Sequence, residues 1–307
     1  MKNGLPLRVG VTGARGFVGQ NVLRFFHARG ASLVAFSRSA NVGKTSADQL
    51  PEWRSFSTAE RCDLRGLDAV VHLAGESVFG RWTRAKKRRI LESRIEGTRQ
   101  VVAGMAALPM TERPGVLVSA SATGYYGNSA EARDEAARPG EGFLAEVTQQ
   151  WEAEARKAEA LGVRVVLLRF GVVLGRGGGA MRLLKPIFRF GLGGRLGDGS
   201  QWMSCLHVKD AAGLVAHAVA EESLHGAVNA VMPKPVRNAE FTKTLATVAG
   251  RQAIFPAPAI ILKLVAGEMS SALLWDSRVL PRRALESDYT FYFPILRDAL
   301  GEVMNDG

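Results

Sequence analysis

Cysteine is scarce in this chain of 307 residues, and long apolar runs are absent from it. Cys62 and Cys205 lie far apart and match no metal-binding spacing, so we expect two free thiols, no metal and a reducing, cytoplasmic location. The most apolar stretch, Val163 to Leu174, is interrupted by arginines and is shorter than the roughly 18 apolar residues that span a membrane. The first residues lack the apolar segment of a signal peptide. We therefore expect no membrane partner.

Acidic residues are outnumbered, with 40 Lys and Arg against 29 Asp and Glu, which gives a net charge of +11. The densest basic run extends from Arg81 to Arg89 and continues into residues with helical spacing. A solvated helix face, an anionic ligand pocket and a nucleic-acid surface all remain open for it. Nucleic acid is the least favoured because no known nucleic-acid module accompanies the charge. We expect an unknown small-molecule substrate, and the sequence leaves the oligomeric state open.

Apolar runs alternate with amphipathic helices over the first half of the chain. This order favours a parallel sheet that is covered on both faces. The expected class is α/β, with a Rossmann-type doubly wound parallel sheet. The expected strands are Leu7 to Val11, Ser32 to Phe36, Asp68 to Leu73, Gly115 to Ser119, Val163 to Phe170 and Ala227 to Val231, with helices at Phe17 to Ala28, Leu144 to Ala160 and His207 to Ala220.

Glycine becomes frequent after Phe170, and the segments 171–179 and 191–197 are expected to form loops or bulges. Beyond Pro233 we expect a small helical unit, with Asn238 capping a helix that starts at Ala239. The predicted domains are an NADP-binding domain of residues 6–170 and 205–232, and a smaller substrate-side domain of residues 171–204 and 233–304.

A glycine loop follows the first expected strand directly. Gly13, Gly16 and Gly19 have the spacing Gly-x-x-Gly-x-x-Gly between a strand and a helix. Gly13 allows a tight turn, Gly16 lets the backbone approach a pyrophosphate, and Gly19 lets the helix pack on the strand. The helix N-terminus then offers free N–H groups to the anion. The pattern predicts a dinucleotide site.

The second expected strand ends in Ser37 and Arg38, without the acid that accepts from the ribose of NAD. The Arg38 guanidinium suits a 2′-phosphate, so we expect NADP(H). Small residues at Leu73 to Gly75 leave room for the cofactor. The predicted cofactor-binding residues are Gly13, Arg15, Gly16, Phe17, Val18, Gly19, Ser37, Arg38, Leu73, Ala74 and Gly75.

These motifs together resemble the extended short-chain dehydrogenase/reductase superfamily. More narrowly, the chain is similar to its NAD-dependent epimerase/dehydratase-like branch, some members of which carry the label cell division inhibitor. The resemblance covers nearly the whole chain, including a C-terminal helical segment after Pro256. It is carried by Thr12 to Gly19, His72 to Glu76, Arg81-Trp82, Ser93 to Thr98, Gly124 to Gly127, Trp151-Glu152 and the segments Gly193 to Gln201 and Pro233 to Phe241.

The resemblance implies hydride chemistry with a Tyr-x-x-x-Lys pair and a Ser or Thr as proton relay. The helix expected to carry that pair, Gly142 to Glu152, contains neither tyrosine nor lysine. Ser121, Tyr126 and Glu146 are the remaining candidates for catalysis, and packing is an alternative role for the tyrosine.

Further polar and aromatic residues are candidates for a substrate pocket that suits an anionic or sugar-like molecule: Glu76, Arg81, Trp82, Gln201, Trp202 and His207. Glu76 would act as a general base if burial raised its pKa. We expect an NADP(H)-dependent oxidoreductase or epimerase-like enzyme. The alternative is an NADP(H)-binding regulatory or sensor protein with little turnover.

Overall fold

The central element of the computed structural model, which describes residues 7–38 and 51–305, is a seven-stranded parallel sheet. Its order is β12-β7-β5-β4-β1-β2-β3, so the chain proceeds to one side from β1 and then to the other from β4. The crevice between the carboxyl ends of β1 and β4 is the topological switch point where such sheets bind ligands. The strands are β1 Arg8–Thr12, β2 Ser32–Ser37, β3 Glu52–Ser55, β4 Ala69–His72, β5 Val116–Ala122, β7 Arg164–Phe170 and β12 Gly226–Ala230.

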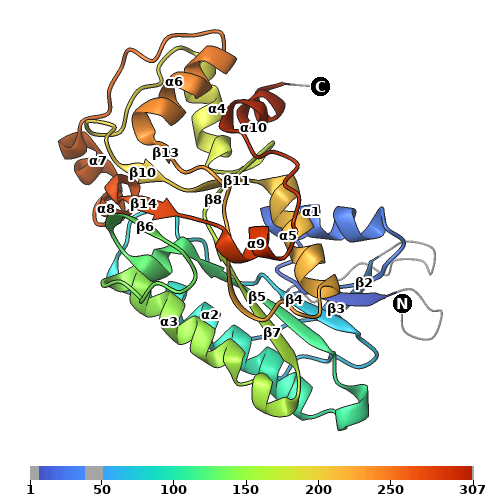
Figure 1. Ribbon diagram of the computed structural model, residues 1–307. Helices are drawn as coiled ribbons and strands as arrows, with labels where there is room; N and C mark the ends of the chain where they lie inside the picture. The colour runs from blue at the N-terminus through green and yellow to red at the C-terminus, as the bar shows by residue number, and fades with distance from the viewer. Residues whose placement is uncertain (1–6, 39–50, 306–307) are drawn as a thin grey trace.

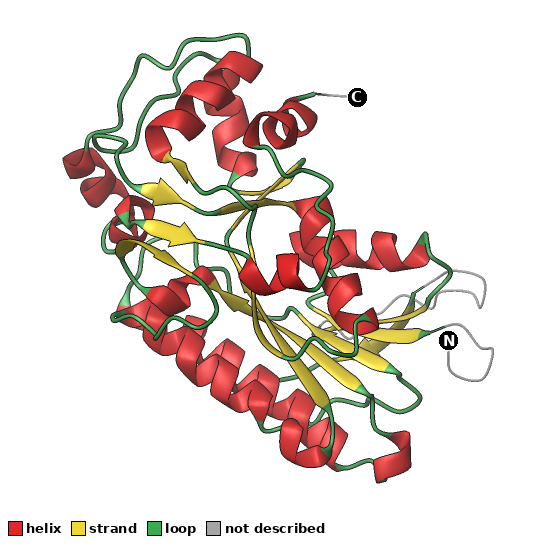
Figure 2. Ribbon diagram, in the orientation of Figure 1, coloured by secondary structure: helices red, strands yellow, loops and turns green. Residues whose placement is uncertain are grey.

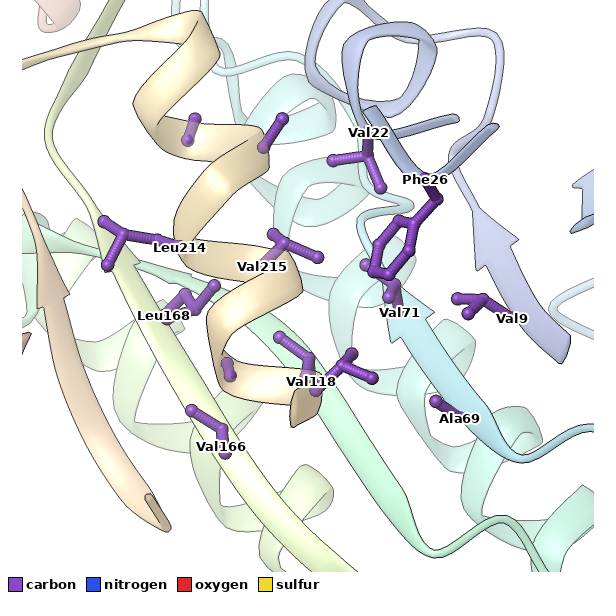
Figure 3. Packing of buried hydrophobic residues seen from close by; sticks show 14 of the residues in the cluster. Val9, Val22, Phe26, Ala69, Val71, Val118, Val166, Leu168, Leu214 and Val215 are labelled. Atoms are coloured by element: carbon purple, nitrogen blue, oxygen red, sulfur yellow. The ribbon is translucent and has the colours of Figure 1, made fainter. Parts of the chain in front are cut away.

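Two pairs of helices cover the two faces of this sheet (Figures 1 and 2). Helices α1 (Phe17–His27) and α5 (Val208–Ala220) lie on one face, and α2 (Arg84–Ala106) and α3 (Phe143–Arg156) lie on the other. Figure 3 shows Leu214 and Val215 of α5 packing on Val118 and Val166 of the sheet. Strands buried on both faces account for the continuous apolar runs of the sequence. The predicted α/β class is confirmed.

Many of the remaining elements form the upper part of Figure 1 and the connections to it. Short sheets pair β8 with β9 and β11, β10 with β13, and β6 with β14. The bounds are η1 Met110–Glu112, η2 Thr123–Tyr126, β6 Ser129–Arg133, η3 Glu159–Leu161, β8 Val172–Gly175, β9 Gly178–Gly179, α4 Met181–Arg189, β10 Trp202–Met203, β11 Cys205–His207, β13 Val236–Arg237, α6 Asn238–Val248, α7 Ala259–Ala266, α8 Met269–Leu274, β14 Ser277–Val279, α9 Arg282–Glu286 and α10 Leu296–Met304.

Two local expectations are wrong. The glycine-rich segment 171–179 contains the strands β8 and β9 instead of only loops, because Gly178 leaves room for the ring of Phe17: a Cβ there would lie 2.0 Å from it. Asn238 is the first residue of α6 and not its cap. Its Oδ1 instead accepts from the Leu196 N–H at 2.9 Å and holds the preceding loop.

The C-terminal segment returns to the sheet after the smaller part. Ala284, Tyr289 and Phe291 belong to the same apolar cluster as Val118. The predicted smaller domain of residues 233–304 therefore shares part of the core of the sheet. The domain division itself stays a prediction, and its first boundary, residue 6, lies outside the described residues.

Candidate functional site

The glycine loop joins β1 to α1 with no space for side chains. Gly13 has φ +67°, and a Cβ there would lie 2.7 Å from the Leu73 carbonyl. A Cβ on Gly19 would lie 2.2 Å from the carbonyl oxygen of Gly13. Glycine is thus required at Gly13 by backbone conformation and at both positions by close approach. The loop has the shape that lets a pyrophosphate reach the N-terminus of α1.

A cavity of about 380 Å³ opens beside this loop. Most of the predicted cofactor residues line it: Gly13, Arg15, Gly16, Ser37, Arg38, Leu73, Ala74 and Gly75. Phe17, Val18 and Gly19 are not among its described lining residues, and the Phe17 ring packs against Gly178 instead. The glycine loop and the end of β2 therefore meet in one cavity, whose size suits part of a dinucleotide.

Several lining residues are not among the predicted cofactor-binding residues, namely Ala14, Phe36, Phe56, Thr58, Glu76 and Ser93. Phe56 and Thr58 follow β3, and Ser93 lies on α2. Glu76 was predicted for a substrate pocket, but the structure places it in this cavity. Ala14 and Phe36 lie beside predicted residues in the glycine loop and in β2, whereas the packing of β3 and α2 beside β2 and β4 brings Phe56, Thr58 and Ser93 to the cavity.

The strand end before Leu73 is fixed by a buried histidine. Thr12 Oγ1 accepts from the N–H groups of Leu73 and Ala74, at 3.1 and 3.3 Å, so its hydroxyl donates to His72 Nδ1 at 2.7 Å. His72 Nε2 then donates to Thr98 Oγ1 at 3.1 Å. Burial, with a smaller effect of a neighbouring arginine, lowers the pKa of His72 to about 4. The ring is therefore neutral, and it holds one wall of the cavity.

Glu76 is an ionised carboxylate and not a base of raised pKa. Its side chain accepts from Lys86 Nζ at 2.7 Å, and Arg89 lies at 3.8 Å. The Lys86 hydrogen bond and the charges of Lys86, Arg89 and Arg38 outweigh burial and lower its pKa. The conditional expectation of a general base with a raised pKa is therefore wrong, because cations dominate its surroundings.

The basic run lies at the N-terminus of α2, and several of its cations are paired. Lys87 contacts Glu268 at 2.7 Å and Arg88 contacts Glu92 at 3.7 Å. Together with the Lys86–Glu76 pair, these contacts tie the helix to the cofactor cavity and to the segment before α8. Ion pairs within the chain therefore neutralise part of the positive charge of the basic run.

The two predicted catalytic hydroxyls lie in a buried network. Ser121 Oγ donates to Glu152 Oε1 at 2.6 Å, and Tyr126 donates to Asn229 Oδ1 at 2.7 Å. Arg169 joins them, since it forms two hydrogen bonds with Glu152 at 2.7 and 2.8 Å and donates to the Tyr126 hydroxyl at 2.8 Å. Burial raises the pKa of Tyr126 to about 12. Both hydroxyls are committed to structural contacts, which argues against the predicted catalytic roles.

The third catalytic candidate, Glu146, is exposed in the first turn of α3. The helix face that packs toward α2 is apolar instead. Val147 and Phe143 lie in a cluster with Trp82, whose ring meets Phe143 edge-on at 5.3 Å. Trp82 is buried, and its Nε1 donates to the Val78 carbonyl at 2.8 Å. Trp82 thus has a packing role in place of the predicted pocket role.

The other predicted pocket residues lie in different places. Trp202 is flanked by the guanidinium groups of Arg237 and Arg278, at 4.2 and 4.7 Å from its ring centre. Gln201 is buried and donates to the Leu196 carbonyl at 3.1 Å, which is a structural contact.

Arg81 is exposed beside Gly267. His207 lines a separate cavity and contacts Glu302 at 3.0 Å, so the structure does not group it with Trp202.

The thiols of Cys62 and Cys205 are buried and free, as expected from the sequence. Burial raises the pKa of each to about 12, so neither is a reactive thiolate near neutral pH. Among residues 7–38 and 51–305, no cluster of three or more His, Cys, Asp or Glu side chains is arranged to hold a metal ion. The described helices include none that is long and apolar enough to cross a bilayer.

The sheet order, the glycine loop and the adjoining cavity define a Rossmann-type nucleotide-binding protein. The pattern of the NAD dependent epimerase/dehydratase family matches residues 9–230, and that of a domain of unknown function, DUF1731, matches residues 257–303. The chain belongs to this epimerase/dehydratase family, a branch of the extended short-chain dehydrogenase/reductase superfamily. The resemblance inferred from the sequence is confirmed.

Named relatives match over nearly their full length. The epimerase family protein YfhF of Bacillus subtilis is 35% identical over 98% of this chain and 99% of its own. A crystal structure of the human epimerase family protein SDR39U1 with NADPH has a TM-score of 0.89 and 33% identity, over 98% of this chain and 100% of that one. UDP-N-acetylglucosamine 4-epimerase from Bacillus cereus, with a TM-score of 0.76 and 20% identity over 97% and 98% of the two chains, shares the fold.

Proposed function

We propose that this protein is an NADP(H)-dependent oxidoreductase or epimerase-like enzyme that acts on a small anionic or sugar-like substrate. The observation that carries the proposal is the cavity in which the glycine loop meets Ser37 and Arg38. The human relative whose crystal structure contains NADPH supports the same cofactor.

The residues around the cavity fit an NADP(H) molecule. The close approaches at Gly13 and Gly19 leave backbone N–H groups and the N-terminus of α1 to meet a pyrophosphate. Arg38 is an exposed cation at the end of β2, where a 2′-phosphate would lie. The chemistry that a bound nicotinamide supplies is hydride transfer. The chain contributes the anion contacts. The hydrogen bonds of His72 with Thr12 and Thr98 hold the wall against which the cofactor would rest.

The substrate side of the proposal rests on Trp202 and its two arginines. Arg278 stacks on Trp202, and its Nε–H is buried without an acceptor in the described part of the chain. Arg237 lies 3.9 Å from the carboxylate of Asp276 and also donates to the Ser200 carbonyl. Two guanidinium groups beside an aromatic ring suit a substrate that carries an anionic group.

Proton transfer in this proposal falls to Glu146. Ser121 and Tyr126 are bound within the buried network, whereas Glu146 is exposed at the start of α3, the helix that would carry the family tyrosine. The role that we propose for Glu146 is that of a base.

The test combines cofactor binding with a search for the substrate. NADPH and NADH are titrated by fluorescence, and the protein is then incubated with NADP(H) and a small-molecule extract that is followed by mass spectrometry. A Gly16→Asp variant, which places a carboxylate at the pyrophosphate, is the control. We expect a metabolite that changes only with the intact protein, and a Glu146→Gln variant that binds NADPH normally but loses this activity. A fully active Glu146→Gln variant would remove Glu146 from the proposal.

The second candidate is an NADP(H)-binding sensor with little turnover. It is favoured by the burial of Ser121 and Tyr126, which leaves the usual hydroxyls without access to a substrate. A sensor binds NADPH tightly, changes no metabolite in the extract, and is insensitive to Glu146→Gln. Protease protection that depends on NADPH but not on the extract would favour this reading over the enzyme.

A further inference from the structure

A second cavity, of about 670 Å³, lies between α1, the start of α5 and the segment that joins α9 to α10. Figure 1 shows this segment passing over α5 toward α10. None of the described residues that line it also lines the cavity beside the glycine loop. It is therefore separate from the proposed cofactor site, and its volume lies in the range of small-molecule pockets. We call it the α1–α5 cavity.

The α1–α5 cavity is strongly basic. Arg24 lines it from α1, Arg29 from the turn that follows α1, Lys209 from the first turn of α5, and Arg176 from the loop after β8. Its only described acidic lining residue, Glu302, is already engaged, because it contacts Arg176 and His207, each at 3.0 Å.

Three of these cations make no ion pair with the carboxylates of the described residues: Arg24, Arg29 and Lys209. The Lys209 ammonium lies only over the Tyr292 ring, at 4.5 Å. Arg29 donates to the Tyr292 hydroxyl at 3.0 Å and to the Phe25 carbonyl at 3.1 Å, which leaves further N–H groups of its guanidinium free to donate. Cations gathered in this way repel one another unless an anion joins them.

The wall of the α1–α5 cavity is held in place by buried hydrogen bonds. Asp210 is fully buried and accepts from the N–H groups of Tyr292 and Phe293, at 2.7 and 3.0 Å. Its carboxylate thus fixes the two aromatic residues at the cavity instead of neutralising the cations in it. The N-terminus of α5 lies at the same place, since its N-cap His207 and Lys209 are both lining residues. The positive end of this helix adds to the potential of the side chains.

We propose that the α1–α5 cavity binds a small phosphorylated molecule with at least two negative charges. Two guanidinium groups, from α1 and the turn after it, and an ammonium from the start of α5 match the several oxygens of a phosphate ester or polyphosphate, whereas a single carboxylate would satisfy one of them. The alternative role of Arg24 and Arg29 is to oppose the negative end of the α1 dipole. That role does not account for Lys209, which lies at the positive end of α5.

The test is calorimetric titration of inorganic tripolyphosphate into the intact protein, with and without saturating NADPH. The variants are Lys209→Gln and Arg29→Gln, and Lys243→Gln is the control of equal charge change, since Lys243 is exposed on α6 outside this cavity. Because each variant removes a cation that would donate charge-assisted hydrogen bonds to the anion, we expect tripolyphosphate to bind at least roughly tenfold more weakly to each cavity variant than to Lys243→Gln.

Three outcomes overturn the proposal. The first is no binding by the unaltered protein. The second is equal affinity in Lys209→Gln and Lys243→Gln. The third is an affinity that falls with Arg38→Gln and with NADPH but not with Lys209→Gln, which places the anion in the cofactor cavity. Binding that persists with NADPH and weakens only in the Lys209 and Arg29 variants supports the α1–α5 cavity.

Discussion

Replacement of Arg169 by methionine is expected to destabilise the protein strongly. Arg169 is 2% exposed and lies between Glu152, the Tyr126 hydroxyl and the ring of Tyr125, whose centre is 3.4 Å from its Cζ. Burial alone would lower its pKa, but the hydrogen bonds and charge of Glu152 raise it above the ordinary value. The guanidinium is therefore charged in the folded protein, and it balances the buried carboxylate of Glu152.

The magnitude follows from what the Arg169→Met variant leaves behind. Glu152 is 4% exposed and keeps only the Ser121 hydroxyl as a side-chain donor. Loss of one partner of a buried ion pair costs about 3–5 kcal/mol, because an unpaired charge remains in the interior. The double variant Arg169→Met with Glu152→Leu should recover most of this loss, since well-packed apolar residues replace buried ion pairs at little cost.

The assay is urea denaturation at pH 7 of the unaltered protein, the two variants and an Arg99→Met control. Arg99 pairs with Glu96 and Glu154, but 48% of its side chain is exposed. An exposed pair contributes at most about 1 kcal/mol, so the control should be nearly neutral. The reasoning is refuted if Arg169→Met costs no more than Arg99→Met, or if the double variant is less stable than Arg169→Met alone.

Three further predictions concern the proposed cofactor site and the strand end beside it. Arg38→Asp should weaken NADPH binding and improve NADH relative to it in fluorescence titrations, because a carboxylate repels a 2′-phosphate and accepts from a 2′-hydroxyl; an equal change for both cofactors would contradict it. Gly19→Ala should weaken NADPH by at least roughly tenfold, since its Cβ would displace the Gly13 carbonyl. The His72 pKa of about 4 lies below the ordinary 6.5, so the unfolded chain takes up the proton first. Urea stability should fall by about 3 kcal/mol as the pH drops through this window, and a His72→Gln variant should lose less; an equal loss in both would exclude His72 as the cause.

The sequence predicts those parts of the structure that depend on patterns within a short stretch of consecutive residues. The glycine loop, the end of β2 and six strands of the sheet depend on local spacing and apolar runs, and each is found near its expected position, whereas the edge strand β3 is not among the expected strands. Asn238 shows the limit of local rules. Its residue type favours a helix cap, but a hydrogen bond to Leu196, 42 positions earlier, decides its role.

The candidate catalytic residues show that local sequence rules are also insufficient to predict which side chains take part in catalysis. Ser121 lies at the end of β5 and Tyr126 follows that strand at the carboxyl edge of the sheet, which is where ligands bind in such folds. Whether their hydroxyls are available depends on Glu152 and Arg169, which are distant in the sequence. Packing on the α3 side of the sheet therefore decides whether these two hydroxyls can reach a substrate, which their position at the end of a strand does not reveal.

The two parts of the candidate site differ in what the structure provides. The cavity beside the glycine loop has the close backbone approaches at Gly13 and Gly19, Arg38 in its lining and a wall held by the Thr12–His72 hydrogen bond. In the catalytic half, proton donation by Tyr126 would require it to leave Asn229 and Arg169, and a pKa of about 12 leaves almost no phenolate near neutral pH. Any proton relay must then use a group outside this network. Activity that depends on Glu146 would identify that group, and NADPH binding without it would mean that the fold retains its cofactor for a purpose other than turnover.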